Sequence, residues 1–311
     1  MDRIPYVEAM ETTQWKLPRI GVWTGALDAV TMSRSQDLAA EIEQMGYGVL
    51  WIPEVAGRDV MLSLGMLLSA TEHLVGATGI ASIWARDAVT MTGGVKGLTE
   101  AFPDRVLLGL GVSHDSLVSG LRGHDYDKPL SAMRSYLEAM DRSPYTAVRP
   151  TTPVRRVLAA LGPKMLELSA AAAGGAHTYF VPPEHTAGAR PLLGEALLCV
   201  EQAVVVETDP VRAREIARAH MKVYVPLPNY RNNLIRLGFG DDDFDGNYSD
   251  RLVDAIVAWG SESDIAARVA DHFDAGADHV CLQALTPKPR DVPVEQWRTL
   301  GGALAELAAA R

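Results

Sequence analysis

The strongest constraint on the fold is a repeated alternation between short apolar runs and segments with the 3.6-residue period of a helix. Roughly eight such units follow one another along the 311 residues. Near-continuous apolar runs are typical of parallel strands that are buried on both faces of a sheet. Eight strand–helix units that close on themselves form a (β/α)8 TIM barrel, so we expect this fold of the α/β class. An open, doubly wound sheet is the alternative.

The expected strands and helix starts give this barrel its boundaries. The strands are expected at 19–23, 48–52, 74–84, 106–110, 156–161, 177–181, 197–206 and 279–285. Helix-capping patterns begin at Ser33, Asp59, Asp87, Asp209 and Ser261, and a final helix is expected over 294–310. Residues 226–260 are expected to form an irregular insertion between the seventh and eighth strands. The chain is thus interpreted as one domain, 1–311, with an N-terminal arm over 1–18.

Composition excludes several classes of protein. Lys and Arg number 29 against 39 Asp and Glu, a net charge of −10, and an acidic surface repels nucleic-acid phosphates. The two cysteines, Cys199 and Cys281, lie in apolar runs and cannot form a disulfide framework. We find neither a signal peptide nor an apolar run long enough to span a membrane, so we expect a cytoplasmic protein without nucleic-acid or membrane partners.

Two strand-to-helix loops carry residues suited to ligand binding. Gly109-Leu-Gly-Val-Ser-His114 begins like a dinucleotide fingerprint, but His114 replaces the third glycine. The glycines would instead let the strand approach a neighbour closely, and the loop suits a planar ligand. Gly162-Pro-Lys164 leads from a strand into a helix, where free N–H groups, the helix dipole and the lysine favour an anion. An ordinary turn with a solvated lysine is the alternative.

The eight histidines show no spacing typical of a metal site, so no metal is predicted. A metal-dependent TIM-barrel hydrolase nevertheless stays open as an alternative function. It would require His114, His124 and a carboxylate to converge.

Four stretches, in order and correctly spaced, resemble the markers of the bacterial luciferase-like flavin monooxygenase superfamily. They are MGYGVLWIPE (45–54), GATGIASIWARD (76–87), FPDRVLLGLGVS (102–113) and LGPKMLEL (161–168). The similarity covers most of residues 19–285. The Ala-rich and Asp/Arg-rich style resembles the branch that uses the deazaflavin coenzyme F420 instead of FMN.

The resemblance implies an oxidoreductase with a flavin-type ring at the C-terminal mouth of the barrel. Coenzyme F420 is the expected cofactor, with FMN as the alternative. A non-proline cis peptide is implied at Gly79–Ile80, beneath the ring. The implied cofactor-binding residues are Gly79, Ile80, Gly111, Ser113, Gly162, Pro163 and Lys164. His114 is the first candidate for the catalytic acid or base, followed by Glu54 and His185.

The resemblance also has departures and leaves the substrate open. Sugar-phosphate dehydrogenase relatives place a catalytic histidine just after the second strand, where this chain has Val55. The expected reaction is hydride transfer to or from a small organic substrate, with oxygen insertion also open. A non-catalytic, cofactor-binding barrel is a further alternative. By resemblance we expect a homodimer. Separately, we expect the insertion near Tyr224–Phe244 to form a lid over the mouth.

Overall fold

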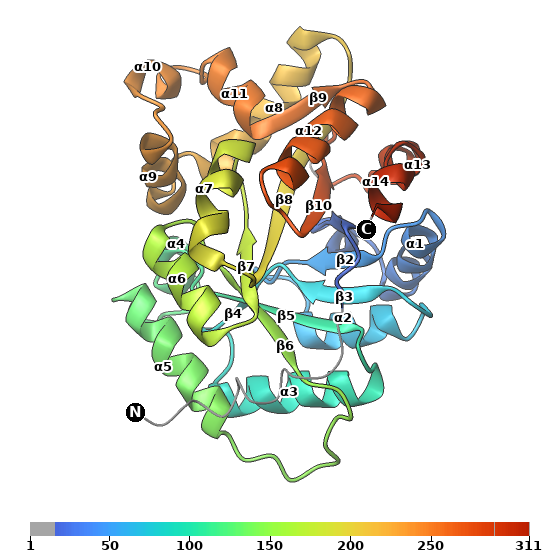
Figure 1. The fold of residues 1–311 in the computed structure, drawn as a ribbon, viewed down its shortest axis with the longest axis vertical. Coiled ribbons are helices and arrows are strands. Elements are labelled where there is room, and N and C mark those ends of the chain that lie inside the picture. Colours follow the sequence, from blue (N-terminus) through green and yellow to red (C-terminus); the bar gives the residue numbers. More distant parts are fainter. Residues whose placement is uncertain (1–15, 289, 311) are drawn as a thin grey trace.

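A computed structural model describes residues 16–288 and 290–310 and shows a closed barrel of parallel strands surrounded by helices (Figure 1). The barrel strands are β1 (Ile20–Trp23), β2 (Val49–Ile52), β3 (Val75–Thr78), β4 (Ala81–Ser82), β5 (Val106–Gly111), β6 (Arg155–Ala159), β7 (Gly175–Thr178), β8 (Leu197–Val206) and β10 (His279–Ala284). Strand β10 pairs with both β1 and β8, which closes the barrel. With β3 and β4 counted as one interrupted strand, the barrel has eight strands, and the predicted (β/α)8 fold is confirmed.

Three strands differ from their expected boundaries by more than one residue. The strand expected over 74–84 is interrupted between β3 and β4, where the Gly79–Ile80 peptide bond is cis. Strand β6 ends at Ala159 and β7 begins at Gly175, each shifted toward the N-terminus. Apolar residues continue past both strand ends into the loops, so hydrophobicity alone misplaced the boundaries.

The helices that cover the barrel begin largely where the caps predict. They are α1 (Met32–Gln44), α2 (Val60–Leu68), α3 (Ala88–Ala101), α4 (Asp115–Val118), α5 (Pro129–Arg142), α6 (Pro163–Ala172), α7 (Pro183–Leu193), α8 (Pro210–Tyr224), α12 (Glu262–Asp274), α13 (Val294–Ala303) and α14 (Ala305–Ala309). Side chains of Asp59, Asp87, Asp209 and Ser261 accept hydrogen bonds from the first turns, as predicted.

Two helix predictions were wrong in detail. Thr31, and not Ser33, caps α1, because its hydroxyl accepts from the Arg34 amide one turn earlier. The final helix is broken at Leu304 into α13 and α14.

Residues 226–260 form ordered secondary structure, so the expectation of an irregular insertion was wrong. They contain α9 (Pro228–Arg236), α10 (Asp241–Phe244), α11 (Asp250–Ile256) and β9 (Val257–Gly260). Strand β9 pairs in parallel with β8 beyond the end of β7, from Ala203↔Val257 to Val206↔Gly260. Apolar side chains of these elements form a second core with α8 and the end of β8. The segment folds because it has its own buried surface.

The barrel interior contains polar groups as well as apolar ones. Trp51 stacks on His177 with ring centroids 4.3 Å apart, and its Nε1 donates to His279 Nε2 at 2.9 Å. His279 Nδ1 in turn donates to the Pro18 carbonyl at 2.5 Å, which fixes one neutral tautomer. Burial lowers the pKa of His177 to about 3 and that of His279 to about 4. Both histidines therefore serve as uncharged core residues near neutral pH.

Candidate functional site

The loops after β2, β4 and β5 meet at one side of the barrel mouth, which we call the bulge side (Glu54, Gly79, Ile80, Ser82, Arg86 and Gly111). The cis bond at Gly79–Ile80 lies here, as the resemblance implied. Gly79 N donates to the Ile52 carbonyl at 2.8 Å, and Trp23 Nε1 donates to the Gly79 carbonyl at 3.1 Å. The adjacent strand β2 and, through the Trp23 side chain, the next strand β1 therefore hold the interrupted third strand from one side.

Glu54 is held on the bulge side by an ion pair. Its carboxylate accepts from the Ser82 amide at 2.8 Å and from Arg86 Nη1 at 3.1 Å, while its own amide donates to the Ile80 carbonyl at 3.3 Å. The side chains of Glu54 and Arg86 are 6% and 9% exposed. Arg86 also contacts Asp59 at 2.8 Å. Glu54 thus supports the bulge from two directions with its negative charge already balanced.

The two glycines of β5 make room for the interrupted strand. A Cβ on Gly109 would lie 2.0 Å from the Thr78 carbonyl oxygen, and one on Gly111 would lie 2.4 Å from the Ile80 Cδ1. Both distances are too short for real contacts, so β5 needs glycine at both positions. The close approach expected from Gly109-Leu-Gly111 is therefore present, and its partner is the neighbouring strand.

His114 lies between the bulge side and the insertion. It stands at the N-cap position of α4, a short helix that the sequence reasoning did not expect there. Its ring lies 5.6 Å from the Tyr230 ring of α9. Burial lowers its pKa below the usual 6.5, against a hydrogen bond to Asn229 that raises it. The preceding residue, Ser113, adopts a left-handed conformation with φ of 58°. His114 is thus half-buried and largely neutral at pH 7.

Polar residues gather on the opposite side of the mouth, after β6 and β7. We call it the insertion side (Gly162, Pro163, Lys164, His185, Asn233 and Arg236). Gly162 caps α6 and Pro163 is its first residue. Arg236, at the end of α9, lies close to this turn: a Cβ on Gly162 would be 3.8 Å from its Nη2. Within the described residues neither Arg236 nor Lys164 has a carboxylate at ion-pair distance. Two unpaired cations therefore flank the start of a helix.

Buried side-chain nitrogens of the insertion side also lack partners. Asn233 is 2% exposed and its Oδ1 accepts from Arg236 at 3.0 Å, while its Nδ2 has no partner among the described residues. His185 Nε2 lies 2.9 Å from the Leu161 carbonyl oxygen, and its Nδ1 is likewise unpartnered. Burial lowers the pKa of His185, and the charge of Arg236 contributes. Since Nε2 of the neutral His185 ring donates to Leu161, its Nδ1 is an acceptor, and the donors available to an anion are Asn233 Nδ2, Arg236 and Lys164. These donors suit a phosphate-like anion.

A cluster of aromatic rings fills the region between β7, β8 and the insertion. The Tyr179 hydroxyl, just after β7, donates to the Gln283 Oε1 at 2.7 Å and is hydrogen-bonded to the Tyr224 hydroxyl at 2.9 Å. Tyr230 of α9 packs 6.1 Å from Tyr179 between ring centroids. Glu201 of β8 is 1% exposed, and burial raises its pKa to about 8. The insertion therefore joins the barrel through a buried network of aromatic and polar groups.

The structure separates the residues that a hydrolytic metal site would need. His114 contacts Asn229 and Tyr230, whereas His124 lies beside Trp84, 6.2 Å away between ring centroids. In the part of the chain that the structure describes, no three His, Cys, Asp or Glu side chains are grouped to hold a metal ion. The same described residues include no helix with the length and apolarity needed to cross a membrane.

The structure brings most of the predicted residues together in two groups. Sequence reasoning missed Arg236. Glu54, Gly79, Ile80 and Gly111 come together on the bulge side, and the 162–164 turn meets His185 on the insertion side. Arg236 was missed because 226–260 was interpreted as irregular. A signal existed: Pro228 at the first helical position, with Tyr230 and Leu234 four residues apart, is typical of an amphipathic helix.

Comparison with known proteins finds one curated protein that is similar to this chain in sequence. The chain resembles a putative coenzyme F420-dependent oxidoreductase of Mycobacterium tuberculosis, with 26% identity over 137 residues. That match covers 42% of this chain and 40% of the relative, so the chain spans well under half of that curated protein.

Solved structures share the fold at low sequence identity. An F420-dependent secondary alcohol dehydrogenase, in complex with an F420–acetone adduct, has a TM-score of 0.75 and 14% identity over 94% of this chain and 99% of its own. The oxygenating constituent of 3,6-diketocamphane monooxygenase from Pseudomonas putida, in complex with FMN, has a TM-score of 0.69 and 14% identity over 94% and 97%.

The family model for luciferase-like monooxygenases matches residues 10–279 of the 311, most of the chain. This match includes both sides of the barrel mouth and the insertion. The chain belongs to the luciferase-like monooxygenase family.

Proposed function

We propose that the protein is an oxidoreductase that transfers a hydride between coenzyme F420 and a small organic substrate, with FMN as the alternative cofactor. The observation that carries the proposal is the unpaired donor set of the insertion side, where Arg236 and Lys164 flank the start of α6. Both cofactors bear a phosphate group, which such a site would bind. F420 is preferred because the relatives named above include two F420-dependent enzymes.

The residues of the two sides would share the work of binding. The 162–164 turn, Arg236 and Asn233 would hold the phosphate, and the backbone around Gly79, Ile80, Gly111 and Ser113 would support the ring. The cofactor supplies the redox chemistry, so the protein contributes positioning and control of the proton. This division explains why one barrel mouth combines a rigid side with a side of unpaired charges.

His114 is our proposed acid or base. Its lowered pKa leaves the ring neutral at pH 7, so it can accept a proton there. Glu54 has its carboxylate committed to Arg86 and the Ser82 amide, which favours a positioning role. His185, bonded to the Leu161 carbonyl, would similarly position the 162–164 turn. Of the three candidates, His114 best combines partial exposure with a place beside the insertion.

The lid, the homodimer and the cytoplasmic location remain parts of the proposal. The contact between Tyr230 and His114 supports a covering role for α9. Because Arg236 belongs to the same helix, removing the insertion should impair cofactor binding as well as turnover. Sedimentation of the purified protein tests the proposed dimer. The measured molecular mass should be twice that of the 33.6 kDa chain.

Titration with both cofactors tests the proposed function. The purified protein should bind F420 with micromolar or better affinity, followed by the change in cofactor absorbance or fluorescence. FMN should bind more weakly. Tighter binding of FMN would select the alternative cofactor, and saturation by neither would overturn the proposal. A cofactor that binds without turnover across a substrate panel would favour the non-catalytic barrel.

A further inference from the structure

A cavity of about 560 Å³ opens at the bulge side of the barrel mouth. It is formed by the loops after β2 and β4 and by the segment that follows α4. Arg122 Nη2 donates to the Val55 carbonyl at 3.0 Å, and Trp84 Nε1 donates to the Val112 carbonyl at 2.9 Å. These bonds tie the three loops together, so the cavity has defined walls.

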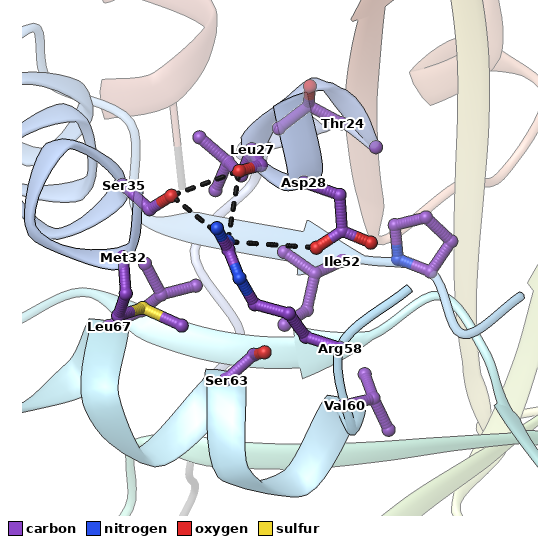
Figure 2. A pocket seen from close by; sticks show the side chains of 12 residues that line it. Thr24, Leu27, Asp28, Met32, Ser35, Ile52, Arg58, Val60, Ser63 and Leu67 are labelled. Carbon is purple, nitrogen blue, oxygen red and sulfur yellow. Dashed lines mark hydrogen bonds and ion pairs between the residues drawn. The ribbon is translucent and has the colours of Figure 1, made fainter. Parts of the chain in front are cut away.

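Three arginines line this cavity, and two of them are already engaged. Arg86 is paired with Glu54 and Asp59, which also belong to the lining. Arg58 turns behind β2, where Nη1 donates to the Leu27 carbonyl at 3.0 Å and lies 3.7 Å from Asp28 (Figure 2). The cavity beside it in that view is only about 20 Å³, room for a single water molecule.

Arg122 is the arginine of this cavity whose charge is not balanced. Its described contact is the one hydrogen bond from Nη2 to the Val55 carbonyl, which leaves further N–H donors available. Among the described residues no carboxylate lies within ion-pair distance of it. An unpaired guanidinium on a cavity wall is well placed to bind an anion.

Part of the otherwise polar lining offers two rings and two apolar side chains beside that charge. Trp84 and His124 lie with ring centroids 6.2 Å apart and planes inclined by 31°. Val55 and Leu121 are 49% and 55% exposed, unusually high for large apolar side chains in a cavity lining. An aromatic ligand would cover these surfaces and remove them from water.

From these features we propose that the cavity binds the substrate, and that the substrate is a small planar molecule with a carboxylate. Arg122 binds the carboxylate through its planar fork, and Trp84, His124, Val55 and Leu121 contact the flat body. That this ligand is the substrate rests on the proposed oxidoreductase function. The binding itself rests only on the cavity. A glutamyl tail of F420 carries the same carboxylate chemistry, but the phosphate site lies across the mouth, on the insertion side.

Calorimetry of the full-length protein with three probes tests the assignment. Benzoate should bind saturably, its neutral analogue benzamide at least about tenfold more weakly, and γ-glutamylglutamate no better than benzamide. Arg122→Gln should weaken benzoate about tenfold and leave benzamide unchanged. Arg142→Gln, at an exposed site on α5, is the matched control and should bind benzoate like the unaltered protein.

Other results with these three probes would overturn the assignment of the cavity. Equal affinity for benzoate and benzamide, unchanged benzoate binding in Arg122→Gln, or no binding of either probe would reject carboxylate recognition by Arg122. Stronger binding of γ-glutamylglutamate than of benzoate, lost in Arg122→Gln, would assign the cavity to a cofactor tail instead. F420 and FMN titrations are run on the same samples. Benzoate binding without cofactor binding would reject the proposed function and keep the carboxylate site.

Discussion

The Glu54–Arg86–Asp59 cluster of the bulge side and the cations of the insertion side differ in whether their charges are paired. On the bulge side, Arg86 forms ion pairs with Glu54 and Asp59, which hold the loops after β2 and β4 together. On the insertion side, Arg236 and Lys164 approach the start of α6 without a carboxylate partner among the described residues. A paired cation stabilises its own fold, whereas an unpaired one is available to a ligand. The contrast therefore separates structural arginines from candidate binding residues, although all are charged and near the mouth.

The largest expected effect comes from breaking the paired side. Arg86→Met should reduce the free energy of unfolding by about 3–5 kcal/mol, because it leaves the largely buried Glu54 carboxylate without its partner. Chemical denaturation measures the loss. Arg34→Met, which removes a half-exposed ion pair with Glu41, should cost at most about 1 kcal/mol. Equal losses in the two variants would show that the Glu54 pair is no more important than a surface contact.

The interior next to the insertion side makes a prediction about pH. Glu201 has a pKa of about 8 in the folded protein, against 4.5 as the ordinary value. Between these values the unfolded chain loses a proton that the folded chain keeps, so stability falls as pH rises. The slope is about 1.4 kcal/mol per pH unit.

Glu201→Gln should remove this loss, because the amide keeps an oxygen for the Phe180 amide. Compared by urea denaturation at pH 5 and pH 7, the unaltered protein should lose about 2–3 kcal/mol more than the variant. A difference that does not change with pH would mean that the Glu201 carboxyl is ionised in the folded state.

The unpaired side predicts an effect on binding instead of folding. Arg236→Gln should weaken cofactor binding at least about tenfold, because a charged donor to the phosphate is lost. Arg231→Gln is the matched control on the same helix, since Arg231 lies over the Phe244 ring, 4.2 Å from its centroid. It should leave the affinity unchanged. A comparable loss in both variants would indicate a general effect of charge on α9.

The smallest effect is expected at His114, which lies between the bulge side and α9 of the insertion. Asn229→Ala should lower the pKa of His114 further, because the hydrogen bond from Asn229 raises it. NMR titration of the imidazole signals measures the shift. Asn232→Ala, an exposed position on the same helix, should leave the pKa unchanged. An upward shift in Asn229→Ala would show that the contact does not favour the charged ring.

Much of the fold could be predicted because the barrel depends on a repeated pattern. The apolar strands, and caps such as Asp59, Asp87 and Ser261, are local signals that survive tertiary packing. The predicted boundaries of β6 and β7 were wrong because buried apolar residues continue beyond the strand ends. The insertion failed for a different reason: its helices are short and bury their apolar residues mainly against α8 and β8.

The candidate site was predictable only where one segment carries it. The cis bond at Gly79–Ile80 follows from the resemblance, and the 162–164 turn from local helix-start chemistry. Arg236 and Arg122 depend on which segments meet in space. Nothing in the sequence around them distinguishes their unpaired charges from the paired charge of Arg86, because pairing is a property of the folded neighbourhood.

Strand β9 limits how the lid proposed for the insertion could move. Its ladder with β8 continues the barrel sheet beyond the end of β7, so the C-terminal end of the insertion is anchored in the wall that it covers. Swinging the whole insertion aside would require those backbone bonds to break. We therefore expect any movement of the insertion to be in the stretch from α9 to α10 and not in β9. Small molecules would then enter and leave more easily by the route on the far side, through the open cavity beside Arg122.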